Sequence, residues 1–375
     1  MPSAPISNLE PPDRPPIAAC VGVAAWKRAA VARLIGDQGP DVVFVETTEA
    51  AVRIARARRG AIGAWPSRAP VDLAERARVA GTPLVWIEDG FIRSSGLGAE
   101  CRPPASIVLD WAGPHFDPSR SSDLENLLNQ TAFDTALTDR AERLVRKIVA
   151  LGVTKYNLPG APALASEGRR TVLVAGQVED DLSVRLGGAG VAGNLDLLRR
   201  ARALEPDALL LYRPHPDVEA GHRRGAVSDI DALSWADRVV RGHALPALLE
   251  AVDAVHVLTS LTGFEALLRG RQVVTHGQPF YAGWGLTRDA APPPRRGRRL
   301  SLVELAAGAL IVYPRYIDPD SGAPCTAEAL VDRLAAQLRP RPTLLSTLRR
   351  LQAEGRRSLG LAPPAHAARA ARETA

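Results

Sequence analysis

Carboxylates, basic side chains and hydroxyls gather in four short segments of the sequence, and each segment directly follows an apolar run. The segments are residues 88–94, 176–183, 212–217 and 258–265. Short apolar runs are typical of buried strands, and ligands of open α/β sheets collect at the carboxyl ends of the strands. We therefore expect the four segments to meet in one binding or catalytic site.

The first two segments carry carboxylates that could act as an acid, a base or a nucleophile. Burial at the end of a strand would raise the pKa of one of the two carboxylates, Glu88 or Asp89, and Arg93 in the same segment could hold an anion. A turn or helix start capped by an aspartate would explain this segment equally well. In the second segment Glu179, Asp180 and Asp181 are consecutive and repel one another. That cost favours a nucleophile or an acid/base over a solvated turn.

The third and fourth segments suit a phosphate. His215 lies between two prolines that fix the backbone, and Arg213 is two residues away. Together they could bind a phosphate or phosphodiester by charge and by hydrogen bonding. Ser260 and Thr262 precede an expected helix, whose N-terminal amides attract anions, although either residue could be a plain N-cap. Glu265, in the first turn of that helix, could bind ribose hydroxyls.

The segments are embedded in two series of alternating strands and helices. The expected strands are 18–24, 42–46, 60–65, 83–87 and 106–110 in the first series, and 171–175, 208–212, 254–258 and 272–276 in the second. Such alternation predicts parallel sheets covered on both faces. We expect an α/β protein of the GT-B type, with two doubly wound Rossmann-like domains facing a cleft. The pattern alone would also fit periplasmic-type binding proteins and GT-B-like epimerases.

The domain boundaries follow from changes in composition along the 375 residues. We expect a disordered N-terminus (1–17), an N-terminal Rossmann-like domain (18–156), a Pro- and Gly-rich linker (157–170), a C-terminal Rossmann-like domain (171–325), C-terminal helices (326–352) and a basic, disordered tail (353–375).

The net charge of +6 is confined to the C-terminal end. Residues 339–375 contain eight arginines and two glutamates, so residues 1–338 are neutral overall. A nucleic-acid-binding protein carries basic charge on its folded body, and we therefore expect no nucleic-acid partner. The Leu- and Arg-rich stretch 344–351 could lie on an anionic membrane or be solvated. Because no window is apolar enough to span a bilayer, we expect a cytoplasmic protein, at most peripheral to a membrane.

No metal site is expected. The three cysteines, Cys20, Cys101 and Cys325, are far apart and lack the Cys/His pairing that zinc needs. Asp229 and Asp231 match the DxD spacing that can hold a nucleotide-bound divalent ion, but no convincing strand precedes them, and we interpret the match as chance. No Walker loop or GxGxxG motif opens a helix after the first strand.

Long strings around the four segments carry a resemblance to a known family. The sequence resembles the capsule polysaccharide biosynthesis family typified by the KpsC proteins, which are β-Kdo glycosyltransferases. The matching strings are EDGFIRSSGLG (88–98), FDPSRSSDLE (116–125), GQVEDDLSV (176–184), YRPHPDVEAGHRRG (212–225), TSLTGFEALLRG (259–270), PFYAGWGLT (279–287) and YPRYIDPDSGAPC (313–325). The likeness runs from about residue 83 to residue 335.

The resemblance implies metal-independent transfer of Kdo from CMP-β-Kdo, with retention of configuration, to a lipid-linked or Kdo-terminated acceptor in capsule linker synthesis. Asp181 would be the nucleophile that forms a glycosyl-enzyme, with Asp180 as the alternative, and Glu88 would be the acid/base. CMP-Kdo is a substrate, and no cofactor is implied. The residues assigned to substrate binding are Arg93, Gln177, Asp180, Arg213, His215, Pro216, Ser260, Thr262, Gly263 and Glu265.

Within that set the resemblance gives Arg213, His215 and the helix start 260–263 to the CMP phosphate. Arg93 would contact the Kdo carboxylate or an acceptor phosphate. Tyr281 and Trp284 could stack on a sugar or pack between the domains. The partners implied are other capsule assembly proteins and the inner face of the bacterial membrane.

One departure from the family leaves alternatives open. KpsC chains typically carry two transferase modules, whereas 375 residues accommodate one. The alternatives are a transferase that uses another CMP-sugar such as a sialic acid, a non-catalytic module that scaffolds capsule assembly, and a GT-B-like epimerase.

Overall fold

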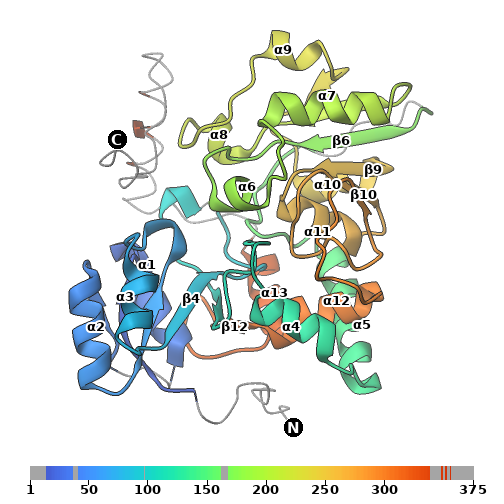
Figure 1. Ribbon diagram of the computed structural model, residues 1–375. Coiled ribbons are helices and arrows are strands. Elements are labelled where there is room, and N and C mark those ends of the chain that lie inside the picture. The colour runs from blue at the N-terminus through green and yellow to red at the C-terminus, as the bar shows by residue number, and fades with distance from the viewer. Residues whose placement is uncertain are drawn as a thin grey trace.

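The chain forms two α/β halves, each built on a six-stranded sheet (Figure 1). The computed structural model describes residues 14–36, 41–96, 98–161 and 168–337, with the isolated positions 348, 351, 352 and 355. The tail predicted at 353–375, most of the helical region 338–352 and most of the N-terminal stretch 1–17 lie outside the described residues.

The N-terminal sheet has a parallel part and an antiparallel part. In spatial order its strands are β12 (Pro314–Tyr316), β5 (Ser106–Asp110), β4 (Leu84–Asp89), β3 (Ala61–Ala64), β1 (Ile17–Val21) and β2 (Val43–Val45). Helix α1 (Ala25–Ile35) packs on one face, and α2 (Thr48–Ala57) and α3 (Leu73–Val79) pack on the other. This is the doubly wound arrangement that the sequence predicts.

The expectation of an entirely parallel N-terminal sheet is wrong at one edge. Strand β5 pairs antiparallel with both β4 and β12. A parallel neighbour needs a long crossover, usually a helix, whereas an antiparallel one needs only a reversal of the chain. Among the described residues between β4 and β5, the only helical element is the short 3-10 turn η3 (Gly98–Glu100). The chain therefore reverses through a loop rather than through a crossover helix.

The C-terminal sheet is parallel throughout. Its strand order is β11 (Arg288–Asp289), β10 (Gln272–Thr275), β9 (Ala254–Val257), β6 (Thr171–Ala175), β7 (Leu209–Arg213) and β8 (Arg238–Val239). Helices α7 (Asn194–Leu204) and α9 (Asp229–Leu233) cover one face, and α10 (Leu245–Ala251) and α11 (Leu261–Leu268) cover the other. The second doubly wound half is thus confirmed.

A group of helices from both halves lies beside the sheets (Figure 1). It comprises α4 (Asp123–Gln130), α5 (Thr135–Ala150), α12 (Leu302–Ala306), the π-helical turn η4 (Ala307–Val312) and α13 (Ala327–Ala336). Helix α5 contacts α12, η4 and α13. After η4 the chain forms β12 in the N-terminal sheet, so it returns before the boundary predicted at residue 325. The other boundaries stay a prediction.

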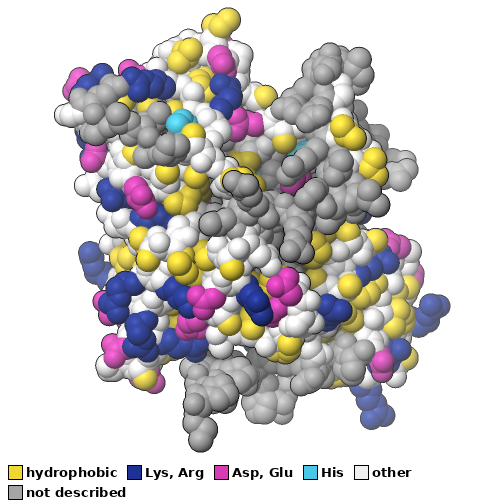
Figure 2. Space-filling view, turned by 180° about the vertical axis from the view of Figure 1, so that it is seen from behind, with side chains coloured by type: hydrophobic (Ala, Val, Ile, Leu, Met, Phe, Trp, Pro, Cys, Tyr) yellow, Lys and Arg dark blue, Asp and Glu magenta, His cyan; other side chains and the backbone are white. Residues whose placement is uncertain are grey.

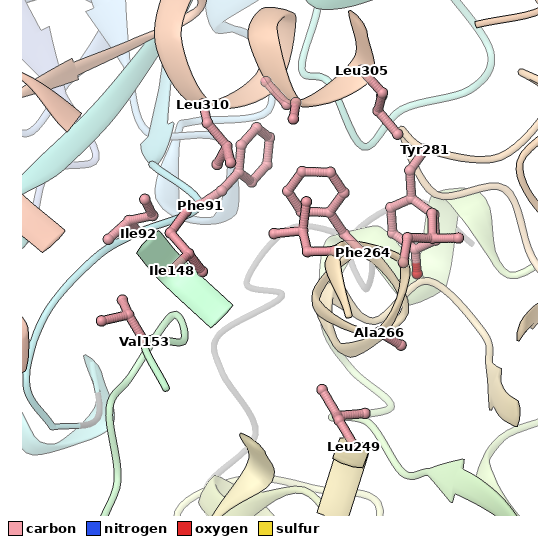
Figure 3. Packing of buried hydrophobic residues seen from close by; sticks show 14 of the residues in the cluster. Phe91, Ile92, Ile148, Val153, Leu249, Phe264, Ala266, Tyr281, Leu305 and Leu310 are labelled. Atoms are coloured by element: carbon pink, nitrogen blue, oxygen red, sulfur yellow. The ribbon is translucent and has the colours of Figure 1, made fainter. Parts of the chain in front are cut away.

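One hydrophobic core is shared by the two halves (Figure 3). Phe91 follows β4 and stacks on Phe280 of the C-terminal half, with ring centroids 4.3 Å apart. Phe264 of α11 packs against both rings. Tyr281 and Trp284 are fully buried in the same core, which supports packing rather than sugar stacking. Aromatic pairs of this kind contribute about 0.5–1.5 kcal/mol each beyond their buried area.

Charges on the described surface are mixed. On the face shown in Figure 2, Lys and Arg side chains are interspersed with Asp and Glu side chains. Among the described residues, no helix is long and apolar enough to cross a membrane.

A buried ion pair holds the loop that carries Phe280. Glu125 of α4 accepts hydrogen bonds from Arg295 (2.8 Å) and Arg296 (3.0 Å). The side chains of Glu125 and Arg296 are only 4% and 3% exposed. Arg296 also donates to the carbonyl oxygens of Pro279 and Ala282, so this pair fixes the loop against α4.

We expect Glu125→Ala to lower the free energy of unfolding by about 3–5 kcal/mol, because the change leaves Arg296 buried without its counter-charge. Urea denaturation measures the loss. As a control, Glu75→Ala removes an exposed ion pair with Arg78 and should leave the midpoint unchanged. Equal stability of Glu125→Ala and wild-type protein would contradict the role given to the buried pair.

Candidate active site

A cleft of about 480 Å³ lies between the two halves. All four polar segments identified in the sequence contribute to its lining. The carboxyl end of β4 supplies the N-terminal wall, and the ends of β6, β7 and β9 supply the C-terminal wall. The structure therefore brings together residues that are up to 177 positions apart, from Glu88 to Glu265.

Asp89, at the end of β4, is held by two cations. Its carboxylate lies 3.1 Å from the Lys27 ammonium and 2.8 Å from Nε of Arg93. Burial alone would raise the pKa of Asp89, but Arg93 and Lys27 outweigh burial and hold the pKa well below its usual range. Asp89 is therefore a permanent anion whose charge is already compensated.

Glu88, the preceding residue, has the opposite electrostatic environment. Burial raises its pKa to about 7, and the adjacent Asp89 carboxylate contributes to the rise. Lys27 opposes the shift only in part. Glu88 therefore exchanges a proton near neutral pH, as a general acid/base requires, and it lines the cleft.

Arg93 supports this wall from behind. Its side chain is 0% exposed, pairs with Asp89, and donates to Ser94 Oγ and the Arg102 carbonyl oxygen. It is absent from the lining of the cleft. The substrate contact predicted for Arg93 stays a prediction, and its position favours a role in holding Asp89.

The three consecutive carboxylates diverge in the structure. Glu179 accepts a hydrogen bond from the Asn194 amide at the start of α7 (2.8 Å). Asp180 pairs with Arg223 at 3.3 Å. Asp181 caps the short helix α6 (Leu182–Gly187), where it accepts bonds from the Ser183 amide and hydroxyl. The Asp181 side chain is 46% exposed, against 22% for Asp180, and both line the cleft. Asp181 is therefore the more accessible of these two carboxylates.

His215 is presented in one tautomer. It caps α8 (Pro216–Glu219), and its Nδ1 accepts a hydrogen bond from the Asp217 amide at 3.1 Å. Burial lowers the pKa of His215 to about 3, so the ring is neutral and carries its proton on Nε2. That N–H is a donor for a ligand, and Pro216 and Arg213 line the cleft beside it.

The start of α11 combines lining and packing residues. Ser260 caps the helix by accepting a bond from the Thr262 amide, and both side chains line the cleft. Gly263 is not in the lining. A Cβ at this position would clash with the Tyr281 hydroxyl oxygen. The small size of Gly263 is therefore explained by packing. Glu265 lines the cleft, but its Oε1 accepts the Lys155 amide at 2.8 Å.

Gln177 links the segment after β6 to the segment after β9 in the C-terminal wall by two hydrogen bonds. Its side chain accepts a bond from the Thr259 amide (2.7 Å) and donates to the Thr259 hydroxyl (3.0 Å). Asp229 and Asp231 are on α9 and do not line the cleft.

Sequence reasoning missed several lining residues. Trp26, Lys27 and Trp65 come from the first 80 residues, and the Lys27 ammonium lies 3.6 Å from the Trp65 ring centroid. Lys155 comes from the end of the predicted first domain. One signal was available: the sequence has only three lysines (Lys27, Lys147 and Lys155), and two of them line the cleft.

Comparison with known proteins identifies the family. A profile described as capsule polysaccharide biosynthesis protein matches residues 60–159 and 142–316. The chain belongs to this family. It is 41% identical over 321 residues to the capsule polysaccharide modification protein LipA of Neisseria meningitidis, a match that covers 85% of this chain and 45% of LipA. The chain thus spans about half the length of that relative.

Three further matches are informative, one to a curated protein and two to solved structures. The lipopolysaccharide-processing protein LpsZ of Rhizobium meliloti is 39% identical over 332 residues, covering 87% of this chain and 76% of LpsZ. The structure of the Thermosulfurimonas dismutans KpsC β-Kdo 2,4 transferase matches with a TM-score of 0.72 and 31% identity, covering 85% of this chain and 98% of that one. Its β-Kdo 2,7 counterpart gives 0.70 and 30%, covering 86% and 100%. The predicted GT-B architecture is confirmed.

We expect the Glu88 carboxyl to titrate with a midpoint near pH 7 in the wild-type protein, and Asp89→Asn to lower that midpoint by at least about one unit. The substitution removes the negative charge that disfavours ionisation of Glu88 while Lys27 remains. Carboxyl ¹³C NMR of glutamate-labelled protein measures both midpoints, and Glu88→Gln identifies the signal. An unchanged midpoint in Asp89→Asn would contradict the coupling.

Proposed function

We propose that the chain is a retaining glycosyltransferase that moves Kdo from CMP-β-Kdo to a lipid-linked or Kdo-terminated acceptor. One observation carries the proposal: a carboxyl that titrates near neutrality, Glu88, shares a cleft with an accessible carboxylate, Asp181, and with a neutral histidine that offers an N–H. The family membership and the names of the two KpsC transferases support Kdo as the sugar.

The first step would form a glycosyl-enzyme. A carboxylate oxygen of Asp181 attacks the anomeric carbon as the bond from that carbon to the phosphate oxygen of CMP breaks, and CMP leaves with the electron pair. The Nε2–H of His215 and the guanidinium of Arg213 would stabilise the charge on the departing phosphate. The hydrogen bonds from Ser183 hold the Asp181 carboxylate in position.

The second step would return the configuration to that of the donor. The ionised Glu88 takes the proton of the acceptor hydroxyl, and the acceptor oxygen displaces Asp181 from the anomeric carbon. Two successive inversions give net retention. Glu88 then releases its proton to solvent, which its pKa of about 7 allows.

Metal independence and membrane location belong to the same proposal. The cations Arg213 and Arg223 and the donor His215 line the phosphate side of the cleft, and we propose that they replace a divalent ion. The acceptor would belong to a capsule linker at the inner membrane, which the chain would contact peripherally from the cytoplasm. Activity that survives EDTA would support the first of these statements.

Asp181→Ala should abolish Kdo transfer, whereas Asp180→Ala should retain it at a reduced level, because Asp180 acts through its pair with Arg223. Mass spectrometry of the acceptor and of the intact protein, after incubation with CMP-Kdo generated in situ, measures both products. In Glu88→Gln, which impairs the second step, one Kdo residue should accumulate on the protein.

The exposed Asp231→Ala on α9 is the matched control and should behave as wild-type protein. Full activity of Asp181→Ala would reject it as the nucleophile. A wild-type protein that uses a CMP-sialic acid in place of CMP-Kdo would favour the alternative donor, and one that binds CMP without any transfer would favour the scaffold.

Transfer should rise with pH through about 7, because Glu88 must be ionised to accept the acceptor's proton and is protonated below its pKa. Glu88→Gln should lower kcat by about 10²–10⁴-fold, as expected for loss of a general base. A pH–rate profile at saturating donor measures the first effect, with the exposed Glu250→Gln as control. A flat profile between pH 5.5 and 8 would contradict the assignment.

A further inference from the structure

Residues 153–158, here called the crossover segment, are held by hydrogen bonds from both halves. The Lys155 amide donates to Glu265 Oε1 of α11 at 2.8 Å. The Lys155 carbonyl oxygen accepts the amides of Arg93 and Ser94 at 3.3 and 3.2 Å, from the N-terminal half. Two of the residues predicted to bind substrate, Arg93 and Glu265, therefore fix the backbone of Lys155.

The remainder of the crossover segment is equally constrained. Asn157 has a left-handed backbone (φ 50°), and its side chain bonds to the Thr154 amide and to the carbonyl oxygens of Thr154 and Ser94. Arg269 Nη2 donates to the Val153 carbonyl oxygen at 3.1 Å. This many bonds around one turn restrict Lys155 to a single backbone position between the halves.

The Lys155 side chain lines the cleft and interacts electrostatically with both of its walls. Its charge acts on Glu88 and Asp89 from one wall and on His215 and Asp217 from the other. Burial alone would lower the pKa of Lys155, but Tyr156, Asp89 and Glu88 outweigh burial and raise it. The amine is therefore a cation at neutral pH.

This cation has no counter-ion of its own. Within the described ranges, the Lys155 ammonium forms no ion pair at 4.0 Å or less. Asp89 is compensated by Lys27 and Arg93, and Glu88 is half protonated near pH 7. The other cleft lysine, Lys27, pairs directly with Asp89, so the two lysines differ in this respect. Lys155 is half-buried, and its ammonium lies 5.4 Å from the Tyr156 ring centroid. A partly dehydrated charge without a counter-ion is costly, and an anionic ligand would remove that cost.

We propose that the Lys155 ammonium binds the carboxylate of the transferred sugar, an ulosonic acid, next to its anomeric carbon. The inference rests on the proposed function and names the residue that selects this sugar class. In such a sugar the carboxylate is attached to the carbon where substitution occurs, so it must lie between the base that serves the acceptor and the group that holds the leaving phosphate. Lys155 is between Glu88 and His215, while the phosphate already has Arg213 and His215.

Glu265 becomes a positioning residue in this scheme. Its carboxylate holds the Lys155 amide rather than a ligand. Glu265→Ala should therefore weaken use of the donor, and Glu265→Gln, which keeps an oxygen acceptor for the same amide, should restore it. A ribose-binding role would instead predict that Glu265→Ala weakens the binding of CMP.

The test compares CMP, which lacks the carboxylate, with CMP-Kdo. We expect Lys155→Met to lower kcat/KM for CMP-Kdo by at least about 100-fold while the Kd for CMP, from calorimetry, changes less than about threefold. Lys155→Arg should lie between Lys155→Met and wild-type protein. Lys147→Met is the matched control, because Lys147 is on α5 and pairs with Asp332 outside the cleft lining.

The outcomes separate the two proposals. If Lys155→Met weakens CMP and CMP-Kdo by the same factor, Lys155 binds phosphate and the carboxylate assignment is overturned. If wild-type protein transfers Kdo and Lys155→Met does so equally well, only the role of Lys155 fails. If wild-type protein neither transfers Kdo nor binds CMP-Kdo more tightly than CMP, both proposals fail. Circular dichroism of each variant confirms that a loss does not come from unfolding.

Discussion

The fold and the site both depend on burying opposite charges at the end of β4. Asp89 is largely removed from water, and its charge is stable there only because Lys27 and Arg93 form ion pairs with it. The Asp89 carboxylate also disfavours ionisation of Glu88, so the charge on Asp89 contributes to the raised pKa of Glu88. The backbone of Arg93 in turn binds the crossover segment. The ion pairs of Asp89 are therefore linked to the acidity of Glu88 and, through Arg93, to the connection between the two halves.

The cleft is formed by strand ends, yet its shape is set by a shared apolar core. The stacked rings of Phe91 and Phe280 link the segment that follows Glu88 and Asp89 to the loop that Glu125 and Arg296 hold. Rigid packing of this kind would suit the proposed chemistry, in which a nucleophile from one half attacks the anomeric carbon and a base from the other half takes the proton of the acceptor. Three polar residues of the C-terminal wall, Asp181, His215 and Ser260, are N-caps of the helices that follow its strands. The capping hydrogen bonds fix the orientation of each of these side chains without a ligand.

The sequence predicts most strands because their apolar runs are short and bounded, and it predicts which segments meet because strand ends share an edge. It does not predict the antiparallel pairing of β5, which depends on the absence of a crossover helix, nor the return of β12 from a distant part of the chain. The family strings assign Arg93 and Glu265 to substrate binding, but Arg93 is buried behind the wall and Glu265 binds backbone. Lys155 lies two residues before the predicted linker, and only tertiary contacts show that its segment is rigid.

The return of β12 to the edge of the N-terminal sheet has a consequence during synthesis on the ribosome. The edge partner of β5 is β12, which lies about 200 residues downstream. Every strand of the C-terminal sheet is therefore translated before β12 can complete the N-terminal sheet. At roughly 5–20 residues per second, the nascent chain presents an unpaired strand edge for on the order of ten seconds or more, which is the kind of edge that invites pairing with another chain. The N-terminal sheet therefore lacks its last edge strand until the C-terminal half has been translated, and the half that begins first is completed last.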